Sequence, residues 1–146
     1  MKAQLSSVKE LVLFEVDDDL LYCKPIEGWP DYHASTCGRI VSTKNEDNRG
    51  KPRVLNNYQT DARGYQRVVL CDSTTGRMQK SYVHRLVAQT HLAAPDDDPR
   101  GTPRNQVNHI DSNPRNNKLS NLEFTSRAEN LQHAMLMRMH RQEADS

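Results

Sequence analysis

The order of elements expected between residues 107 and 139 constrains the fold more than any other feature of the sequence. Residues 107–110 and 122–124 read as two short strands, and the turn formers Asn113 and Pro114 lie between them. Polar residues after the second strand mark the start of a helix. A chain with this order must fold a β-hairpin directly before a helix, which indicates an α+β protein.

The helix expected after this hairpin has a defined start. Ser126 and Glu129 have the spacing of a capping box, in which each residue satisfies a backbone N–H of the first turn. Leu131, Met135 and Met139 then recur at helical spacing. We therefore expect these three side chains to form the buried face of the helix.

The central part of the chain predicts a β-rich arrangement. Residues 64–70 and 78–83 read as a hairpin whose turn ends near Gly76. Apolar residues at helical spacing follow and predict a helix over residues 84–91. Short strands on either side of Gly38 are also expected.

The N-terminal segment, residues 1–24, is acidic. Val12, Phe14 and Val16 alternate with other residues as in a strand, and a short helix is the alternative. The run of aspartates at 17–19 interrupts the pattern. The sequence assigns no role to this segment.

Composition excludes several classes of protein. Only 35% of the 146 residues are hydrophobic and the mean hydropathy is −0.88, so the expected core is small for the length. A run of ~20 apolar residues, which a membrane span needs, is absent, and the N-terminus lacks the features of a signal peptide. Cys23, Cys37 and Cys71 form no C-x-x-C pair, which argues against a disulfide framework or a four-cysteine zinc site. We therefore expect a protein of the reducing cytoplasm.

Charge is concentrated in the middle of the chain, although the net charge is only +1. Residues 32–94 hold ten basic and four acidic residues, whereas residues 1–31 have a net charge of −4. A solvated face is the ordinary explanation of such a region, and a surface that binds the phosphates of double-stranded DNA is the other. The side chains expected to contact DNA are Arg49, Lys51, Arg53, Arg63, Arg67, Arg77, Lys80 and Arg85.

His109 stands among hard oxygen donors, which indicates a catalytic centre. A histidine can take a proton from water near neutral pH, and the carboxamide oxygens of Asn108 and Asn130 suit a cation such as Mg²⁺. Together they can activate water beside a metal-bound phosphate. Asn121 carries both a donor and an acceptor and can hold the loop that orients His109. Adjacent side chains of a strand point in opposite directions, so a twist or bulge is needed to turn both His109 and Asn108 toward one phosphate.

The same residues resemble the HNH endonucleases of the phage and intron-associated type. The segments that carry the resemblance are His84-Arg85-Leu86-Val87-Ala88, Val107-Asn108-His109-Ile110-Asp111, Asn116-Asn117, Asn121-Leu122-Glu123-Phe124-Thr125 and Glu129-Asn130-Leu131-Gln132-His133-Ala134. Upstream, Glu27-Gly28-Trp29 and Gly38-Arg39-Ile40-Val41-Ser42 resemble the nuclease-associated modular motif that often precedes such cores. The match covers residues 82–134 almost without a break.

The resemblance implies a ββα-metal nuclease core with Mg²⁺ or Mn²⁺ as the cofactor. It makes His109 the general base and Asn121 a further catalytic-site residue. It makes Asn108 and Asn130 metal ligands, with His133 as a further candidate. Asn108 departs from the family, in which aspartate is frequent at this position, so we expect weaker metal binding.

The sequence thus predicts three parts: an acidic segment (1–24), a β-rich basic DNA-binding module (25–81, here the basic module) and an HNH core (82–140). We expect a monomer or homodimer that nicks or cleaves double-stranded DNA, without an organic cofactor or a membrane partner. The leading hypothesis is a homing enzyme of a phage or mobile element, acting in the cytoplasm of a bacterial or phage-infected cell. A restriction or defence nuclease and a non-catalytic DNA-binding protein are the alternatives. His84 is expected to pack at a helix start and Asp111 to stabilise a turn.

Overall fold

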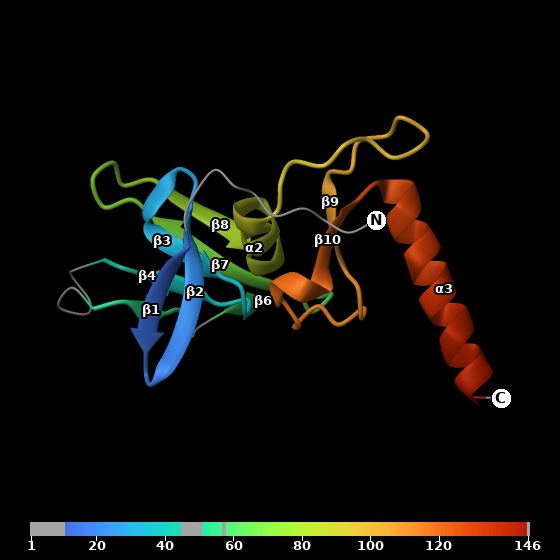
Figure 1. Cartoon of the computed structure of the whole chain (residues 1–146), viewed down its shortest axis with the longest axis horizontal. Coiled ribbons are helices and arrows are strands. Elements are labelled where there is room, and N and C mark those ends of the chain that lie inside the picture. Colours follow the sequence, from blue (N-terminus) through green and yellow to red (C-terminus); the bar gives the residue numbers. More distant parts are fainter. Residues whose placement is uncertain (1–10, 45–50, 57, 146) are drawn as a thin grey trace.

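The computed structural model describes residues 11–44, 51–56 and 58–145, and in them it is an α+β structure. Its largest sheet is antiparallel, with its strands side by side in chain order (Figure 1). The strands of this sheet are β1 (Val12–Val16), β2 (Asp19–Ile26), β3 (Trp29–Ser35), β4 (Ile40–Ser42) and β5 (Arg53–Val54). The expected fold class is confirmed.

Two smaller antiparallel sheets and two α-helices complete the described part of the chain. One sheet contains β6 (Gln59–Thr60), β7 (Gln66–Cys71) and β8 (Met78–Tyr82), and the other pairs β9 (Gln106–His109) with β10 (Leu122–Thr125). The helical elements are α2 (Val83–His91), the 3-10 helix η1 (Leu119–Asn121) and α3 (Arg127–Asp145). Both expected hairpins and both expected helices are present.

Residues Val12–Val16 of the acidic segment form a strand, not the alternative helix. β1 pairs with β2 in an antiparallel hairpin, and Val16 pairs with Asp19 next to the turn. Asp17 and Asp18 have φ values of 49° and 67° in this two-residue turn. Positive φ at both positions matches the right-handed twist of the strands, and aspartate tolerates it better than most residues. The aspartates that seemed to interrupt a strand therefore join two strands.

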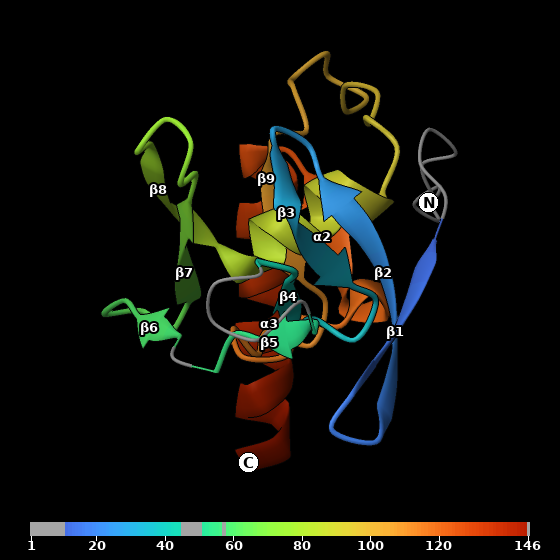
Figure 2. The same ribbon diagram turned by 90° about the vertical axis from the view of Figure 1, so that its left-hand side faces the viewer.

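α2 lies at the centre of the molecule, between the five-stranded sheet and the three-stranded sheet (Figure 2). Its buried residues Val83, Leu86 and Val87 follow the helical spacing seen in the sequence. Tyr32, Leu70 and Leu122, one from each sheet, belong to the same hydrophobic cluster as α2. One core therefore joins all three sheets.

This shared core runs across the expected divisions of the chain. β2 extends from Asp19 to Ile26 and so crosses the expected boundary between residues 24 and 25. The cluster around α2 combines residues from both sides of the expected boundary between residues 81 and 82. The basic module and the HNH core are therefore packed as one hydrophobic unit.

The prediction of a buried face on α3 is wrong. The capping box is present, but Leu131, Met135 and Met139 are between 56% and 60% exposed. α3 packs against β9 and β10 near its start, and the remainder extends away from the body of the molecule (Figure 1). Spacing on a helix shows which residues share a face, and it does not show that a partner covers that face. No helix in the described residues has the length and apolar character that crossing a membrane requires.

Candidate active site

The hairpin of β9 and β10 carries the candidate site. Asn108 is opposite Glu123 and His109 is opposite Leu122, with the same register along the whole ladder. No bulge interrupts this pairing, so the bulge considered from the sequence is absent. Because side chains alternate along a strand, Asn108 and His109 leave opposite faces of the hairpin at the end of β9.

His109 lies on a buried, aromatic face. Its ring stacks on Tyr65 with centroids 5.7 Å apart and lies 4.9 Å from the ring of His84. Tyr82 lies edge-on to Tyr65 and also contacts His84. His109 is only 5% exposed, so its ring is confined on this face.

One side-chain hydrogen bond fixes the His109 ring. Nε2 of His109 lies 2.7 Å from Oδ1 of Asn117, which is itself buried. The Asn117 amide group, Nδ2, donates to Oε1 of Gln66 on β7 at 2.9 Å. A chain of two hydrogen bonds thus links β7 to one nitrogen of the ring.

Asn121 and Asp111 organise the loop that follows β9. Oδ1 of Asn121 accepts from the Asp111 backbone N–H at 3.0 Å, and Nδ2 donates to Oδ1 of Asp111 and to the Asn116 carbonyl, each at 2.9 Å. The side-chain amide of Asn116 and the backbone N–H of Asn113 hydrogen-bond the Asp111 carboxylate and lower its pKa. Asn121 therefore contacts the loop from both ends, and Asp111 is held within a turn.

The other face of the hairpin collects carboxamides and one carboxylate. Nδ2 of Asn108 donates to Oε1 of Glu123 at 3.0 Å, and Nδ2 of Asn130 on α3 donates to Oε1 of Gln106 at 2.9 Å. Gln106 and Asn108 share a face because they are two residues apart in β9. The structure therefore places Asn108 and Asn130 on the same side of the hairpin.

This donor set fits a hard divalent cation. Both asparagines use their amide N–H groups for neighbouring side chains, which leaves each Oδ1 as an acceptor. Glu123 adds a negative charge beside Asn108. In the described residues no group of three or more His, Cys, Asp or Glu side chains is placed to hold a metal. Oxygen donors of this kind are what Mg²⁺ prefers.

Two sets of contacts anchor the start of α3, which carries Asn130. Ser126 and Glu129 make the reciprocal capping-box bonds, at 3.0 Å and 3.2 Å. Arg104 also forms a two-pronged ion pair with Glu129, at 2.9 Å and 3.1 Å. The Arg104 guanidinium lowers the pKa of the Glu129 carboxyl. These bonds tie the first turn of α3 to the segment before β9.

His84 is buried beside His109 and is neutral at ordinary pH. Burial, and then the nearby charge of His109 when protonated, lower the pKa of His84 to about 4. The expected packing role of His84 agrees with its place under Tyr65 and Tyr82. Its Nδ1 is buried without a hydrogen-bond partner in the described part of the chain. His133, the further candidate ligand, has its Nε2 3.5 Å from Oγ of Ser112.

The basic module meets the His109 loop through a close backbone contact. A Cβ atom on Gly38 would lie 2.6 Å from the backbone carbonyl of Asn117, and the φ of Gly38 is 90°. Leu119 N–H donates to the Thr36 carbonyl at 2.9 Å. Only glycine fits position 38, so the β3–β4 turn is fitted directly onto the loop that holds the His109 ring.

Basic side chains of the module differ in how firmly they are held. Arg63 is exposed and lies over the Tyr65 ring, 5.1 Å from its centroid. Arg77 lies 4.2 Å from the Trp29 ring centroid and donates to a backbone carbonyl, and Arg85 donates to the Asn105 carbonyl.

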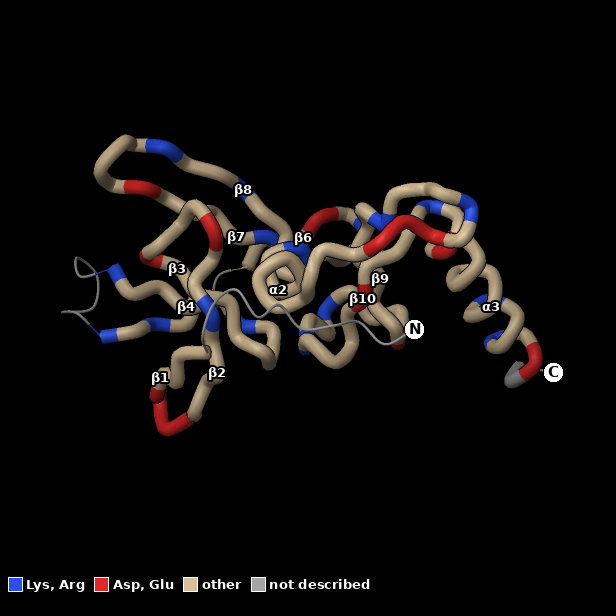
Figure 3. The backbone as a smooth tube through the Cα atoms, turned by 45° about the horizontal axis from the view of Figure 1, so that its top comes forward, with Lys and Arg blue, Asp and Glu red and all other residues tan. Residues whose placement is uncertain are grey.

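The other expected DNA-contacting side chains vary in their exposure. Lys51, Arg53 and Lys80 are exposed and Arg67 is partly buried, while Arg49 lies outside the described residues. Basic positions recur along the strands, whereas acidic positions gather at the β1–β2 turn and in the loop before β9 (Figure 3).

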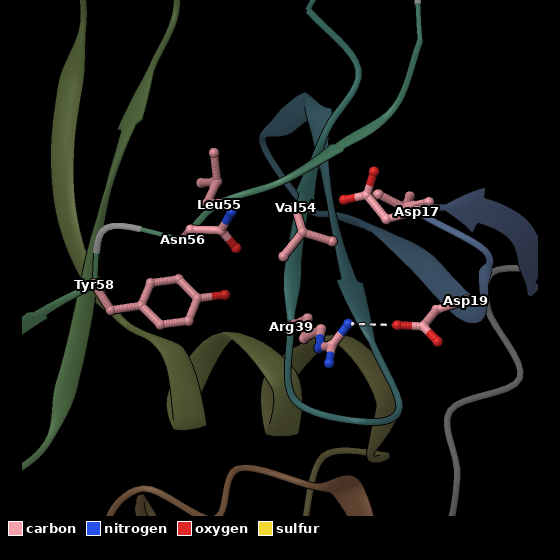
Figure 4. Close-up of a pocket in the computed structure, with 8 residues that line it drawn as sticks. Asp17, Asp19, Arg39, Val54, Leu55, Asn56 and Tyr58 are labelled. Atoms are coloured by element: carbon pink, nitrogen blue, oxygen red, sulfur yellow. Dashed lines mark hydrogen bonds and ion pairs between the residues drawn. The ribbon is translucent and has the colours of Figure 1, made fainter.

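A separate pocket of about 250 Å³ lies beside the β1–β2 turn (Figure 4). Arg39 and Asp19 form an ion pair of 3.3 Å at its rim. Its described lining residues are Val16, Asp17, Asp19, Arg39, Val54, Leu55, Asn56 and Tyr58. None of them belongs to the β9–β10 hairpin, so this pocket is distinct from the candidate active site.

Sequence reasoning missed four residues that contact the candidate site residues. Tyr65, Gln66 and Asn117 surround His109 directly or through one hydrogen bond, and Glu123 holds Asn108. The only signal in the sequence for Glu123 was the expected pairing of the two strands. Placing Glu123 opposite Asn108 also requires the register of that pairing. Contacts between β7 and the loop have no signal in a single sequence.

Comparison with known proteins gives the class of the chain. Residues 24–71 match the family model described as the NUMOD4 motif. Two proteins of Acanthamoeba polyphaga mimivirus, both named uncharacterized HNH endonucleases, are each 33% identical to the chain, over 75% and 76% of it. The solved structure of the HNH homing endonuclease I-HmuI, which describes DNA binding and cleavage, matches with a TM-score of 0.61 and 28% identity. The matched region covers 84% of this chain and 66% of the I-HmuI chain.

The chain is therefore related to the HNH endonucleases by sequence and by fold, and the expected resemblance is confirmed. The NUMOD4 match also confirms the upstream motif. The matched regions are 28% and 25% of the two viral proteins, so the chain spans about a quarter of the length of these curated relatives.

Proposed function

We propose that the chain is a metal-dependent endonuclease that hydrolyses a phosphodiester bond of double-stranded DNA. The observation that carries this proposal is that one short hairpin holds the candidate base and two carboxamide oxygens, and a phosphate lying across the end of β9 would meet both faces. His109 is held on one face by Asn117, and two carboxamide oxygens are presented on the other. The relatives named HNH endonucleases support the same class of reaction.

In the proposed reaction, His109 accepts a proton from the attacking water. The water oxygen bonds to phosphorus, the bond to the 3′ oxygen breaks, and that oxygen takes a proton from solvent. Asn121 holds the loop after β9 so that the His109 ring keeps its place. The chain thus supplies both the base and its support.

Asn108 and Asn130 are the proposed ligands of Mg²⁺ or Mn²⁺, with Glu123 beside them and His133 as a further candidate. Such an ion supplies positive charge to the phosphate oxygens as charge develops there. Both asparagine ligands are neutral, so we expect the phosphate of bound DNA to complete the site. The capping box and the Arg104–Glu129 pair keep Asn130 in position.

The basic module, residues 25–81, is the proposed DNA grip ahead of the HNH core at residues 82–140. Arg63 and Lys80 are exposed on it, and contacts of such side chains with phosphates give affinity without reading sequence. The structural similarity to I-HmuI, a homing endonuclease that binds and cleaves DNA, favours a homing role in a phage or other mobile element. We propose the cytoplasm of the host cell, where its DNA is accessible, as the place of action.

A plasmid-nicking assay tests the proposed activity. Supercoiled plasmid incubated with the protein and Mg²⁺ should become nicked or linear, and EDTA should abolish the conversion. Asn130→Ala should reduce the conversion, and raised Mn²⁺ should restore part of it. Equal activity with EDTA, or none under any divalent metal while the protein still binds DNA, would contradict the proposal.

Salt dependence tests the proposed DNA grip separately. Combined replacement of Arg63, Arg67 and Lys80 by Ala should lower the slope of log affinity against log salt by at most about 2.7, since each phosphate contact contributes roughly 0.9. The measurement is duplex binding by fluorescence anisotropy between low and moderate salt. Replacement of Arg138 and Arg141 on the outer part of α3 is the matched control. An unchanged slope in the triple variant would show that these side chains only face solvent.

A further inference from the structure

We propose that Asn117 and Gln66 are positioning residues that keep a proton on Nε2 of His109 and leave Nδ1 to accept the proton of the attacking water. This inference rests on the proposed function, because it assigns the reactive nitrogen of the proposed base. The two hydrogen bonds that join Gln66, Asn117 and His109 carry it.

The first step of the argument is the order of donors and acceptors. Gln66 presents Oε1 to the amide group of Asn117, which directs the other end of that side chain, Oδ1, to the His109 ring. An amide oxygen has no hydrogen to donate, so Nε2 of His109 must be the donor in this bond. Neutral imidazole has one N–H, and its other nitrogen is then an acceptor.

The second step is that a base passes through two protonation states. Neutral His109 must hold one proton, and protonated His109 donates from both nitrogens. The Asn117 oxygen accepts from Nε2 in both states, so nothing around that nitrogen has to rearrange when Nδ1 gains its proton. If the Asn117 amide were reversed, its N–H group would face the Nε2–H of the protonated ring, and the two donors would repel each other.

The third step concerns charge. Many histidines are oriented by a carboxylate, which also stabilises the protonated ring and raises its pKa. Asn117 is neutral, so it orients the ring without adding this effect. A base must have a free nitrogen when water arrives, and a neutral partner adds no charge that would favour the protonated ring.

The fourth step concerns the part of the chain that contributes Gln66. It lies at the start of β7, within the residues matched by the NUMOD4 motif and next to Arg67, a proposed DNA contact. Gly38, in the same motif, is packed against the Asn117 backbone. The basic module therefore contributes part of the catalytic centre and does more than hold DNA.

The ring nitrogens report the proton directly in the free protein. Long-range ¹H–¹⁵N correlation spectra distinguish the protonated from the unprotonated nitrogen of a neutral imidazole, and the spectrum of His109→Ala assigns the signal. We expect Nε2 to carry the proton and Nδ1 to be bare. A proton on Nδ1 would overturn the proposal even if the protein nicks DNA. The expected pattern in a protein that never nicks DNA would leave the positioning intact and contradict the proposed function.

Asn117→Asp tests the oxygen that faces the His109 ring. The carboxylate has nearly the same shape and still accepts from Nε2, so the Nε2–H tautomer should persist. Asn105→Asp is the control, because it adds the same charge at an exposed residue before β9. A mixture of tautomers in Asn117→Asp, with a single tautomer in Asn105→Asp, would contradict the proposal.

Gln66 variants test the outer bond. Gln66→Ala should produce a mixture of His109 tautomers and lower kcat several-fold, with the KM for DNA unchanged. Gln66→Glu should restore the single tautomer, because a carboxylate can only accept from the Asn117 amide. Gln79→Ala, on the exposed strand β8, is the matched control. A single Nε2–H tautomer in Gln66→Ala would remove Gln66 from the proposal.

Discussion

The two faces of the β9–β10 hairpin differ in how completely the protein prepares them. On one face His109 is buried against Tyr65 and His84, and Asn117 fixes its ring. On the other, Asn108 and Asn130 have their amide groups engaged and their oxygens left as acceptors. One strand therefore separates the face that holds the His109 ring from the face on which we propose that an ion and a phosphate bind.

This difference has a physical basis. A general base works best when its proton acceptor is already oriented, and packing achieves that without substrate. Two neutral carboxamides beside one carboxylate hold a divalent ion weakly on their own, so the phosphate of DNA adds the missing charge. Such a division would couple metal binding to the presence of substrate.

Removing the base should give the largest effect. His109→Ala should lower the nicking rate by roughly 100- to 10,000-fold, the usual contribution of a general base, and leave DNA affinity unchanged. His140→Ala is the control, because His140 is exposed on α3. Nicking by His109→Ala at close to the parental rate would assign the base elsewhere, and the contrast between the two faces would fail.

The buried aromatic face should make stability depend on pH. The unfolded chain protonates His84 near pH 6.5 and the folded chain near pH 4, so the unfolded state holds more protons between these values. The free energy of unfolding should therefore fall as the pH falls from 6.5 to 4, by up to about 3 kcal/mol.

Urea denaturation of the parent and of His84→Leu across this range checks the effect. The variant should lose most of the slope, and the part that remains is expected from His91, whose pKa burial also lowers. His140→Ala should keep the parental slope. Parallel pH profiles for the parent and His84→Leu would show that the face is open to water.

The loop that supports His109 should account for a smaller loss. Asn121→Ala removes the partner of the Asp111 backbone N–H and of the Asn116 carbonyl, which costs roughly 1–3 kcal/mol when such groups are buried. Activity should fall together with the melting temperature. An inactive variant with parental stability and weaker metal binding would instead make Asn121 a metal ligand.

Metal affinity should show the smallest effect. It concerns the face of the hairpin that carries Asn108 and Asn130. Asn108→Asp replaces a neutral oxygen by a charged one and should strengthen Mg²⁺ or Mn²⁺ binding to the free protein about tenfold, since one favourable charge interaction of ~1.4 kcal/mol has this effect. Titration calorimetry without DNA measures it, with Asn105→Asp as the charge-matched control. Unchanged affinity in Asn108→Asp, combined with loss of binding in Asn130→Ala, would exclude Asn108 as a ligand.

Local structure was predictable where short-range chemistry decides it. Ser126 and Glu129 form the capping box expected from their spacing, and Val68 and Leu70, two residues apart in β7, are both buried as the alternation of a strand allows. The same local pattern on α3 predicted burial for Met135, which is exposed. Periodicity fixes a face of a helix, but only the tertiary arrangement decides whether anything packs on it.

The residues of the candidate site stay a prediction from the sequence, and their arrangement comes from the structure alone. His109, Asn108 and Asn130 follow from the types of side chain that metal-assisted hydrolysis uses. The contacts of Gln66 and Asn117 join positions 51 residues apart in the sequence, and no single sequence specifies such a pairing. Asp17 and Asp18 show the same limit at short range, since a pair of aspartates marks a turn only when the flanking strands are recognised.

The contact between Gly38 and the backbone of Asn117 limits how the parts of this chain can be exchanged. Any side chain at position 38 would push on the segment that holds the His109 ring. Exchange of the whole basic module for an unrelated one would therefore bring a turn that does not fit this segment. If the chain is the proposed endonuclease, new target preferences are accessible through single substitutions on the exposed surfaces of the strands, where this fit is untouched.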